Sequence, residues 1–229
     1  MMDNIFDIDF FDGHPIITSG DHIILIDTGA PSSIHLGDTL HFCQHNYACS
    51  TDYFGFDIDR ISALLGKRIT TLLGADILSN YVLQLDYKNK VAAFNSSSFI
   101  LNGVEIPIEI FMGIPIMEFL VNGQRVKFFL DTGAKRSYLP SDFTNSVEIL
   151  GVDEDFFPMI GTFNTQLYEI NTRLDNYEFK VQYGNLPTLL EMTLTMSGVK
   201  GVMGYDFFNH FKVAIDLKNG HLTYEKHWI

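Results

Sequence analysis

The sequence has few cysteines and no long apolar run. Only Cys43 and Cys49 occur among the 229 residues, so no disulfide framework is predicted. No apolar stretch approaches the roughly 20 residues that a membrane-spanning helix needs. The acidic N-terminal residues lack the basic and apolar regions of a secretion signal. We therefore expect a cytoplasmic protein that does not associate with membranes.

Basic residues are also scarce. Fifteen Lys and Arg residues stand against 28 Asp and Glu residues, which gives a formal net charge of −13. A chain of this charge is poorly suited to bind nucleic acid or an anionic membrane surface. The glycines near residue 200 lack the strand and helix that a phosphate-binding loop requires. No Ser-His-Asp or Cys-His catalytic pattern is supported either. We therefore do not predict binding to nucleic acid or to an anionic membrane, a phosphate-binding loop, or catalysis by a Ser or Cys nucleophile.

One short segment contains residue types that bind zinc, namely His41, Cys43, His45 and Cys49. The first three alternate along the chain and would therefore lie on one face of a strand. Tetrahedral zinc sites usually take their ligands from two separated elements. We therefore predict no metal site and no cofactor.

The composition that remains favours strands. Hydrophobic residues make up 46% of the chain, and 20 Phe and 10 Tyr residues favour strands over helices. Asn-Gly pairs at 102–103, 122–123 and 219–220 predict tight hairpin turns. We expect an all-β chain whose helices are short, over residues 58–65 and 205–210.

The most informative feature is a repeated motif. Asp-Thr-Gly-Ala occurs at residues 27–30 and again at 131–134, and an apolar, strand-like run leads into each copy, over 22–26 and 126–130. A carboxylate at the end of a buried strand is costly unless it has a use. Two such carboxylates in matching settings predict one shared site that is built from two related halves.

A second repeat follows each motif. Gly74 and Gly204 each come after two apolar residues, and Asp86 and Asp216 each follow twelve residues later. Duplication of both signals in the same order indicates two related halves. We interpret the two glycines as permitting close packing behind the shared site. The later acidic residues are interpreted as structural, at helix starts or strand turns: Asp76, Asp86, Asp206 and Asp216.

With these motifs the chain resembles the retropepsin-like aspartic peptidases, with two copies fused into one polypeptide. The two Asp-Thr-Gly-Ala motifs, the segments 72–74 and 202–204, and the stretch 130–139 carry the resemblance. It implies a bilobal acid-protease fold of the pepsin and retropepsin type. It also implies an aspartic endopeptidase that acts as a monomer on a peptide or protein substrate, with Asp27 and Asp131 as the catalytic residues.

The division between the halves is expected at the polar stretch 95–98. Residues 1–96 would form an N-terminal retropepsin-like lobe with the first motif. Residues 97–229 would form a C-terminal lobe with the second motif.

The resemblance also implies roles for the motif residues. Gly29 and Gly133 would let the backbone turn tightly and bring its N–H close to the carboxylate. Thr28 and Thr132 would hydrogen-bond the opposite strand and so join the halves. These residues would support the loops of the active site.

Ala30 and Ala134 complete the two motifs and are informative because they lack a hydroxyl group. A Ser or Thr at this position would stabilise an ionised carboxylate and lower its pKa, and Ala cannot do so. Two carboxylates held about 3 Å apart retain one proton between them. We therefore expect activity at mildly acidic to near-neutral pH.

The halves differ in length between their motifs. The first spans 47 residues from its catalytic Asp to the later Gly, and the second spans 73. The longer interval contains 157–165, which predicts an apolar hairpin with a glycine near its tip. We expect this hairpin to be a single flap over the substrate, because the first half shows no comparable glycine-bearing hairpin. The expected flap and substrate-binding residues are Ile160, Gly161, Thr162 and Phe163.

Three alternatives remain open at this stage. The chain could be a catalytically silent peptide-binding module of the same fold, or a narrow processing protease for one partner protein. It could also be an obligate homodimer whose sites form between two chains.

Overall fold

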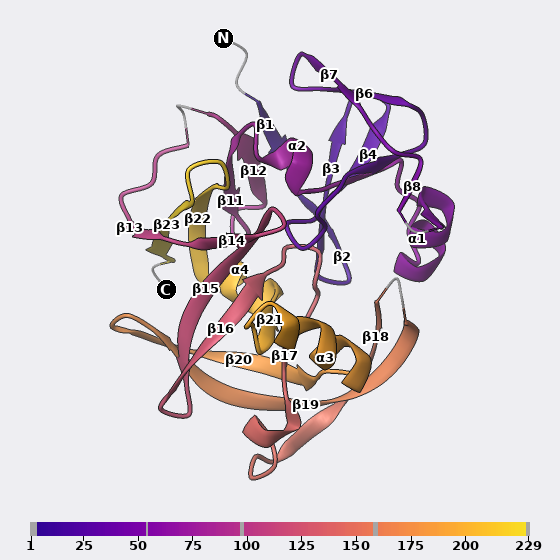
Figure 1. The fold of residues 1–229 in the computed structure, drawn as a ribbon. Helices are drawn as coiled ribbons and strands as arrows, with labels where there is room; N and C mark the ends of the chain where they lie inside the picture. Colours follow the sequence, from indigo (N-terminus) through magenta and orange to yellow (C-terminus); the bar gives the residue numbers. More distant parts are fainter. Residues whose placement is uncertain (1–3, 54, 97–98, 158–159, 228–229) are drawn as a thin grey trace.

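The computed structural model describes residues 4–53, 55–96, 99–157 and 160–227. Strands dominate, and they form one large sheet in each half, a third large sheet shared by both, and two small two-stranded sheets (Figure 1). The first half lies at the top of this view and most of the second half lies below it. None of the helices in the described ranges has the length and apolar character needed to cross a membrane.

The sheet of the first half has five strands in the order β2-β3-β4-β10-β5. β4 and β10 are parallel, so the first Asp-Thr-Gly-Ala motif leaves β4 beside the end of β10. Two small hairpins, β6–β7 and β8–β9, follow β5. The strands are β2 (Asp9–Phe11), β3 (His14–Ser19), β4 (His22–Ile26), β5 (Ile34–His35), β6 (Thr39–Phe42), β7 (His45–Ala48), β8 (Asp52–Tyr53), β9 (Phe56–Asp57) and β10 (Thr71–Leu73).

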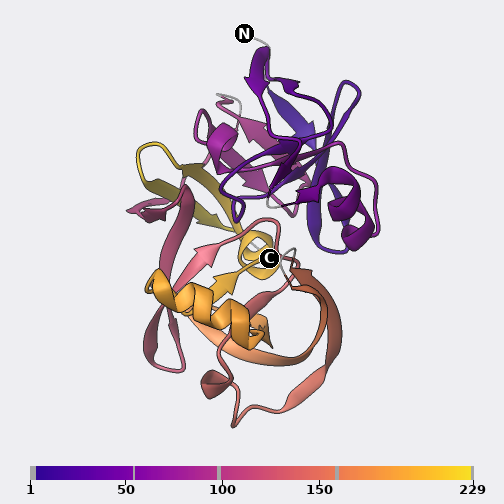
Figure 2. The ribbon, with the colours of Figure 1, turned by 45° about the vertical axis from the view of Figure 1, so that its right-hand side comes forward.

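The sheet of the second half repeats this plan and extends it. Its order is β14-β15-β16-β21-β17-β20-β19-β18, and β16 and β21 are parallel. The long strands β19 and β20 curve around one side of this half (Figure 2). The strands are β14 (Glu109–Phe111), β15 (Ile114–Val121), β16 (Gln124–Leu130), β17 (Ser137–Leu139), β18 (Ile149–Phe157), β19 (Gly161–Leu174), β20 (Tyr177–Asn185) and β21 (Gly201–Met203).

A six-stranded sheet joins the halves in the order β1-β12-β11-β22-β23-β13. Its central pair is β11 with β22, and the register runs from Val82 opposite Asp216 to Leu85 opposite Val213. A buried cluster that includes Phe94 from one half and Phe207 from the other packs between the sheets. The strands are β1 (Ile5–Asp7), β11 (Val82–Asp86), β12 (Val91–Phe94), β13 (Val104–Pro107), β22 (Phe211–Asp216) and β23 (His221–Lys226).

The predicted helices are confirmed at α1 (Ile58–Leu65) and α4 (Tyr205–His210). The N-terminus of α1 is capped by Asp57, whose side chain accepts a 2.8 Å hydrogen bond from the N–H of Arg60. Sequence reasoning missed α2 (Ala75–Leu78), the 3-10 turn η1 (Ser141–Phe143) and α3 (Thr188–Met196). The first residues of α3 follow a proline and have no side-chain cap, which removes the usual start signal.

Two of the three predicted Asn-Gly hairpins are present. The pair 122–123 joins β15 to β16 with positive φ at both residues, and the pair 219–220 joins β22 to β23. The pair 102–103 makes no hairpin, so that prediction was wrong. A Cβ at Gly103 would lie 2.1 Å from the carbonyl oxygen of Tyr224, so the glycine is needed for close packing on β23 instead.

The halves share one further repeat, which lies in two hairpins. The β2–β3 and β14–β15 hairpins have equivalent registers, with Phe11 opposite His14 and Phe111 opposite Ile114. The two residues at each tip have positive φ. We name these tips the first tip (residues 12–13) and the second tip (residues 112–113).

Candidate active site

The two repeated motifs meet in the structure. Asp27 follows β4 and its N–H donates to the carbonyl of Leu73 at 3.0 Å. Asp131 follows β16 and its N–H donates to the carbonyl of Met203, also at 3.0 Å. Each aspartate is therefore held at the end of a strand by the parallel strand beside it.

Thr28 and Thr132 join the two loops through buried hydrogen bonds. The N–H of each residue donates to the hydroxyl of the other at 3.0 Å. Each hydroxyl then donates across the halves at 2.8 Å, from Thr28 to the carbonyl of Leu130 and from Thr132 to that of Ile26. These contacts have the form that the resemblance implied, and they fix the loops relative to one another.

Gly29 and Gly133 bring the two carboxylates together. The N–H of Gly29 donates to Asp27 Oδ1 at 2.9 Å, and that of Gly133 donates to Asp131 Oδ1 at 2.8 Å. A Cβ at Gly29 would lie 2.3 Å from Cγ of Asp131, and one at Gly133 would lie 2.5 Å from Cγ of Asp27. Each glycine therefore lies directly against the carboxylate of the other half, and no larger residue fits there.

The two carboxyl groups hydrogen-bond each other and both have raised pKa values. Burial is the main cause that raises the pKa of Asp27 to about 6. Burial, followed by repulsion from Asp27, raises the pKa of Asp131 well above its usual value. A pair of this kind holds one proton between its members near neutral pH.

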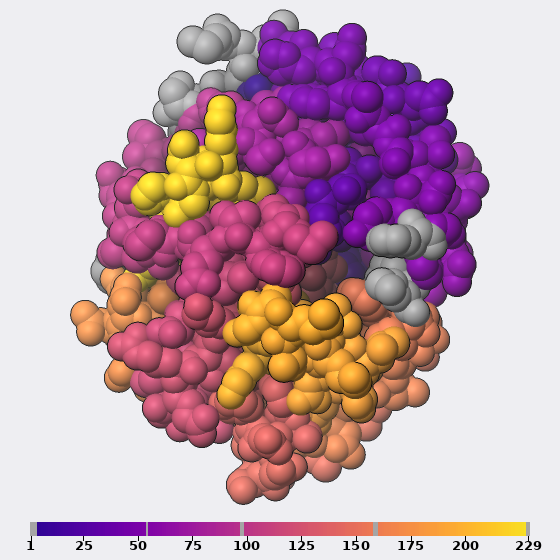
Figure 3. Space-filling view, viewed as in Figure 1, coloured from indigo at the N-terminus to yellow at the C-terminus, as the bar shows by residue number. Residues whose placement is uncertain are grey.

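The carboxyl pair lies in a cleft of about 350 Å³ between the halves. The surface is hollowed at this boundary, beside α3 (Figure 3). Ala30 and Ala134 line the cleft. Its walls are otherwise mainly apolar, with Tyr53, Phe56, Ile61 and Leu72 from the first half and Phe111, Phe129, Leu190 and Val202 from the second.

The hairpin predicted near residue 160 is present, but it is longer than expected. β18 and β19 pair from Ile149 opposite Tyr168 to Phe157 opposite Gly161. Residues 158–159 of the predicted segment lie outside the described residues. Of the expected flap residues, Phe163 lines the cleft, Ile160 packs against the apolar cluster of the second half, Gly161 has a positive φ, and Thr162 is exposed.

The first half also carries a glycine-bearing hairpin, which the sequence reasoning did not expect. β8 and β9 pair around Gly55, whose φ is 79°. Tyr53 and Phe56 from this hairpin line the cleft. Its strands are two residues long, which is too short for an alternating pattern to predict.

Sequence reasoning missed several polar contacts next to the carboxyl pair of Asp27 and Asp131, which we call the dyad. His14 is 3% exposed and its Nδ1 lies 2.8 Å from the carbonyl oxygen of Gly133, so Nδ1 carries the proton and donates. Tyr138 donates to Asp155 of β18, and both residues are buried. Lys135, which directly follows the second motif, has a side chain that is only 9% exposed.

Gly74 and Gly204 pack as predicted behind the motifs. A Cβ at Gly74 would lie 2.8 Å from the carbonyl oxygen of Ala30, and one at Gly204 would lie 2.4 Å from that of Ala134. The serine hydroxyls of Ser33 and Ser137, which the sequence reasoning missed, each accept a hydrogen bond from one of these glycine N–H groups.

The acidic residues that were interpreted as structural have structural partners. Asp86 accepts hydrogen bonds from the N–H and side chain of Asn89, and Asp216 does the same with Asn219. Asp76 and Asp206 lie in the first turns of α2 and α4.

The Cys and His segment makes no metal cluster within the described part of the chain. His41 Nδ1 lies 2.8 Å from the side-chain oxygen of Asn46 across the β6–β7 hairpin. Cys43 packs against the core, and burial raises the pKa of its thiol to about 12.

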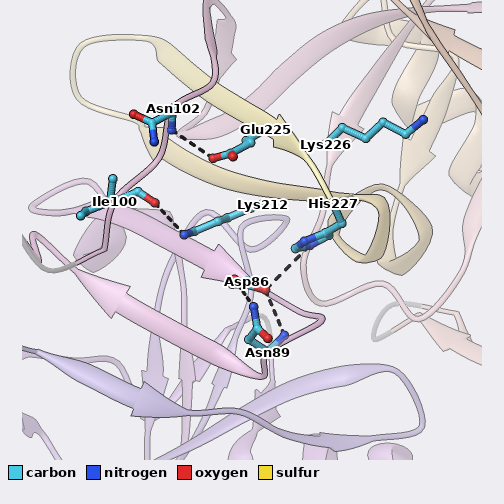
Figure 4. Close-up of a pocket in the computed structure, with 8 residues that line it drawn as sticks. All are labelled: Asp86, Asn89, Ile100, Asn102, Lys212, Glu225, Lys226 and His227. Atoms are coloured by element: carbon cyan, nitrogen blue, oxygen red, sulfur yellow. Dashed lines mark hydrogen bonds and ion pairs between the residues drawn. The ribbon is translucent and has the colours of Figure 1, made fainter. Parts of the chain in front are cut away.

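A second pocket of similar volume lies away from the dyad, where the shared sheet ends (Figure 4). It is polar: Lys212 donates to the carbonyl of Ile100, and the N–H of Asn102 donates to Glu225. His227 Nε2 lies 3.8 Å from Asp86 Oδ1. Asp86 also accepts hydrogen bonds from the N–H and the side chain of Asn89.

Residues 117–210 match a protein family described as "gag-polyprotein putative aspartyl protease". The aspartic proteinase from Irpex lacteus is similar over 98% of this chain and 97% of its own, at 11% identity and a TM-score of 0.54. A retropepsin-like aspartic protease from Rickettsia conorii covers 53% of this chain and 89% of its own, at 19% identity and a TM-score of 0.38.

The simian foamy virus (mac) protease covers 40% of this chain and 88% of its own, at 12% identity and a TM-score of 0.30. No curated protein sequence matches the chain. The fold is that of the aspartic proteases, in its two-lobed form and over nearly the whole chain. The predicted fold class and the predicted resemblance are therefore confirmed.

Proposed function

We propose that this protein, which has the fold of the aspartic proteases, is an aspartic endopeptidase. It hydrolyses peptide bonds with Asp27 and Asp131 as its catalytic residues. The observation that carries the proposal is the mutual contact of the two carboxyl groups, each enclosed by the glycine of the other half. A pair of carboxyl groups whose pKa values are raised by burial in a cleft is typical of catalytic carboxylates.

The chemistry follows from the shared proton. The ionised carboxylate takes a proton from a water molecule between the two groups, and the water oxygen bonds to the substrate carbonyl carbon. The protonated carboxyl gives its proton to the carbonyl oxygen. The carboxyl group that took the proton from water then gives it to the leaving nitrogen as the C–N bond breaks. The other carboxylate takes a hydroxyl proton from the intermediate, which restores a carbonyl and leaves one proton on the pair.

The cleft suits an extended peptide or protein segment. Strands border it on both sides, and substrate backbone can hydrogen-bond along such a groove in the manner of a strand. Its mainly apolar walls favour apolar side chains next to the cleaved bond. The β18–β19 hairpin, with Ile160, Gly161, Thr162 and Phe163, covers the substrate in this proposal.

Both carboxylates come from one chain, which supports a monomeric enzyme. A homodimer with sites between chains is not needed to form the pair, because the threonine hydrogen bonds already join the two motifs within one chain. Mass measurement in solution tests this part of the proposal.

Cleavage of a diverse peptide library between about pH 4 and pH 7.5 tests the function. The wild type should cleave, and Asp27→Asn and Asp131→Asn should each lose at least a hundredfold in kcat/KM. Asp142→Asn, at an exposed position outside the cleft, is the matched control and should match the wild type. Cleavage that survives either dyad substitution would refute the mechanism. Peptide binding without cleavage by the wild type would favour the silent binding module.

A further inference from the structure

The two hairpin tips reach the lobe opposite their own at pseudo-symmetric places. A Cβ at Gly13 of the first tip would lie 3.1 Å from Cβ of Lys135, just beyond the second motif. A Cβ at Gly113 of the second tip would lie 2.9 Å from Cβ of Ala75, behind the first motif. The tips therefore flank the dyad on opposite sides, and the residues around them can be compared position by position.

At the first tip, ion pairs connect the residues that follow the second motif to the β18–β19 hairpin. Lys135 Nζ lies 2.8 Å from Asp12 Oδ2 and 3.6 Å from Asp153 Oδ1 of β18. Arg136 Nε lies 2.8 Å from Asp153 Oδ2. We name these four residues the Asp153 cluster. Its central lysine is nearly buried, so solvent screens it less than an exposed pair.

Two further contacts join the same stretch of β18 to residues near the second motif and the first tip. Tyr138, beside the second motif, donates to Asp155. The ring of Phe156 lies 5.9 Å from that of His14 and also packs against the apolar cluster of the first half. Residues 153, 155 and 156 of β18 therefore each contact a residue near the first tip or the second motif.

The pseudo-symmetric end differs in the chemistry of its equivalent side chains. Pro31 and Ser32 take the places of Lys135 and Arg136, and Met112 and Ile114 take those of Asp12 and His14. None of these four side chains can form an ion pair. All four line the cleft, and Met112 is 66% exposed. Within the described residues, the counterparts of these side chains stand outside the cleft lining, namely Asp12, His14, Lys135 and Arg136.

We infer that the cleft is closed at one end by the Asp153 cluster and open at the apolar end near Met112. This inference rests on the proposed function and adds to it the shape of the substrate. A bound peptide extends freely from the cleaved bond in one chain direction, over the apolar surface of the second tip and α3. In the other direction it meets the ion pairs within a few residues, since each extended residue adds about 3.3 Å.

Two series of peptides that share one cleaved bond test this inference. One series is lengthened stepwise toward the N-terminus and the other toward the C-terminus. For the wild type, kcat/KM should be maintained or rise along one series and fall about tenfold beyond the first few residues of the other. Equal tolerance of both series would overturn the inference and leave the proposed peptidase intact.

Asp153→Ala removes both ion pairs of β18 and keeps the Asp12–Lys135 pair. It should restore kcat/KM for the long peptides of the disfavoured series by about tenfold and leave the favoured series unchanged. Glu109→Ala is the matched control, because it removes the 2.7 Å ion pair with Lys127, outside the cleft lining. Lys135→Met, which keeps the apolar stem, is a second variant with the same expected effect. An unchanged length profile in both would overturn the inference.

Binding of both peptide series, each carrying a fluorescent label, to the Asp27→Asn variant separates this inference from the proposed function. Unequal binding of the two series, without cleavage by the wild type, would support the closed end and refute the peptidase. Failure of every peptide to bind would refute both. Thermal unfolding of each variant verifies that a changed profile does not come from loss of the fold.

Discussion

Thr28 and Thr132 exchange hydrogen bonds across the two halves, each N–H donating to the hydroxyl of the other at 3.0 Å. Both residues are almost completely buried. The contact therefore links the position of one Asp-Thr-Gly-Ala loop to that of the other, and its loss leaves buried backbone groups without partners.

Replacement of Thr132 by Val should lower the free energy of unfolding by about 2–4 kcal/mol, because the N–H of Thr28 and the carbonyl of Ile26 lose their partner. Thr132→Ser retains the hydroxyl and should cost clearly less. Urea denaturation of both variants measures the difference. Equal stability of Thr132→Val and the wild type would show that the threonine contact does not join the halves.

Gly133→Ala should abolish cleavage even if the protein folds. Its Cβ would lie 2.5 Å from Cγ of Asp27, which forces the two carboxylates apart. Gly151→Ala is the control, since nothing lies within 4 Å of a Cβ there. Peptide cleavage and circular dichroism of both variants test this, and full activity of Gly133→Ala would contradict the close approach described here.

The dyad should destabilise the fold near neutral pH. The pKa of Asp27 is about 6 in the folded protein, above its usual value of 3.8, so the folded state keeps a proton that the unfolded state has lost. Stability then falls as pH rises from about 4 to 6. Asp27→Asn removes the ionisation and should stabilise the protein at pH 7 by on the order of 1–3 kcal/mol, with little gain at pH 4. A gain that does not depend on pH would contradict the raised pKa.

Tyr138→Phe should loosen the β18–β19 hairpin. Burial raises the pKa of Asp155, and the bond from Tyr138 opposes that rise by stabilising the carboxylate. Without the hydroxyl, ionised Asp155 is left poorly partnered, at a cost of about 1–3 kcal/mol that grows from pH 4 to pH 7. Hydrogen exchange along β18 should accelerate, whereas Tyr168→Phe, whose hydroxyl bonds Gln166, should not affect it. Unchanged exchange in Tyr138→Phe would contradict the role of this bond in holding the hairpin.

The dyad could be predicted from sequence because each motif describes its own strand end and the chain carries it twice. The helix at 58–65 was predictable for a similar reason, since its cap and its C-terminal glycine are local signals. The motifs and this helix are short, and the residues that determine their structure lie within or next to each segment.

The surroundings of the dyad depend on contacts between distant residues. His14 and Gly133 are 119 positions apart, and Lys135 and Asp12 are 123 apart, so no local pattern pairs them. The equivalence of the two tips was available in the sequence, because Gly13 and Gly113 lie in matching segments. From that repeat, the difference between His14 in the first half and Ile114 at the equivalent position of the second half was predictable.

The most direct test of the central claim is a carboxyl ¹³C NMR titration of Asp27 and Asp131. If the two groups share one proton, their signals should titrate as a coupled pair, with one proton retained to about pH 6 or above. The pair behaviour should vanish in Asp27→Asn. Independent ionisation of both groups near their usual value of 3.8 would contradict the shared proton and the peptidase chemistry that depends on it.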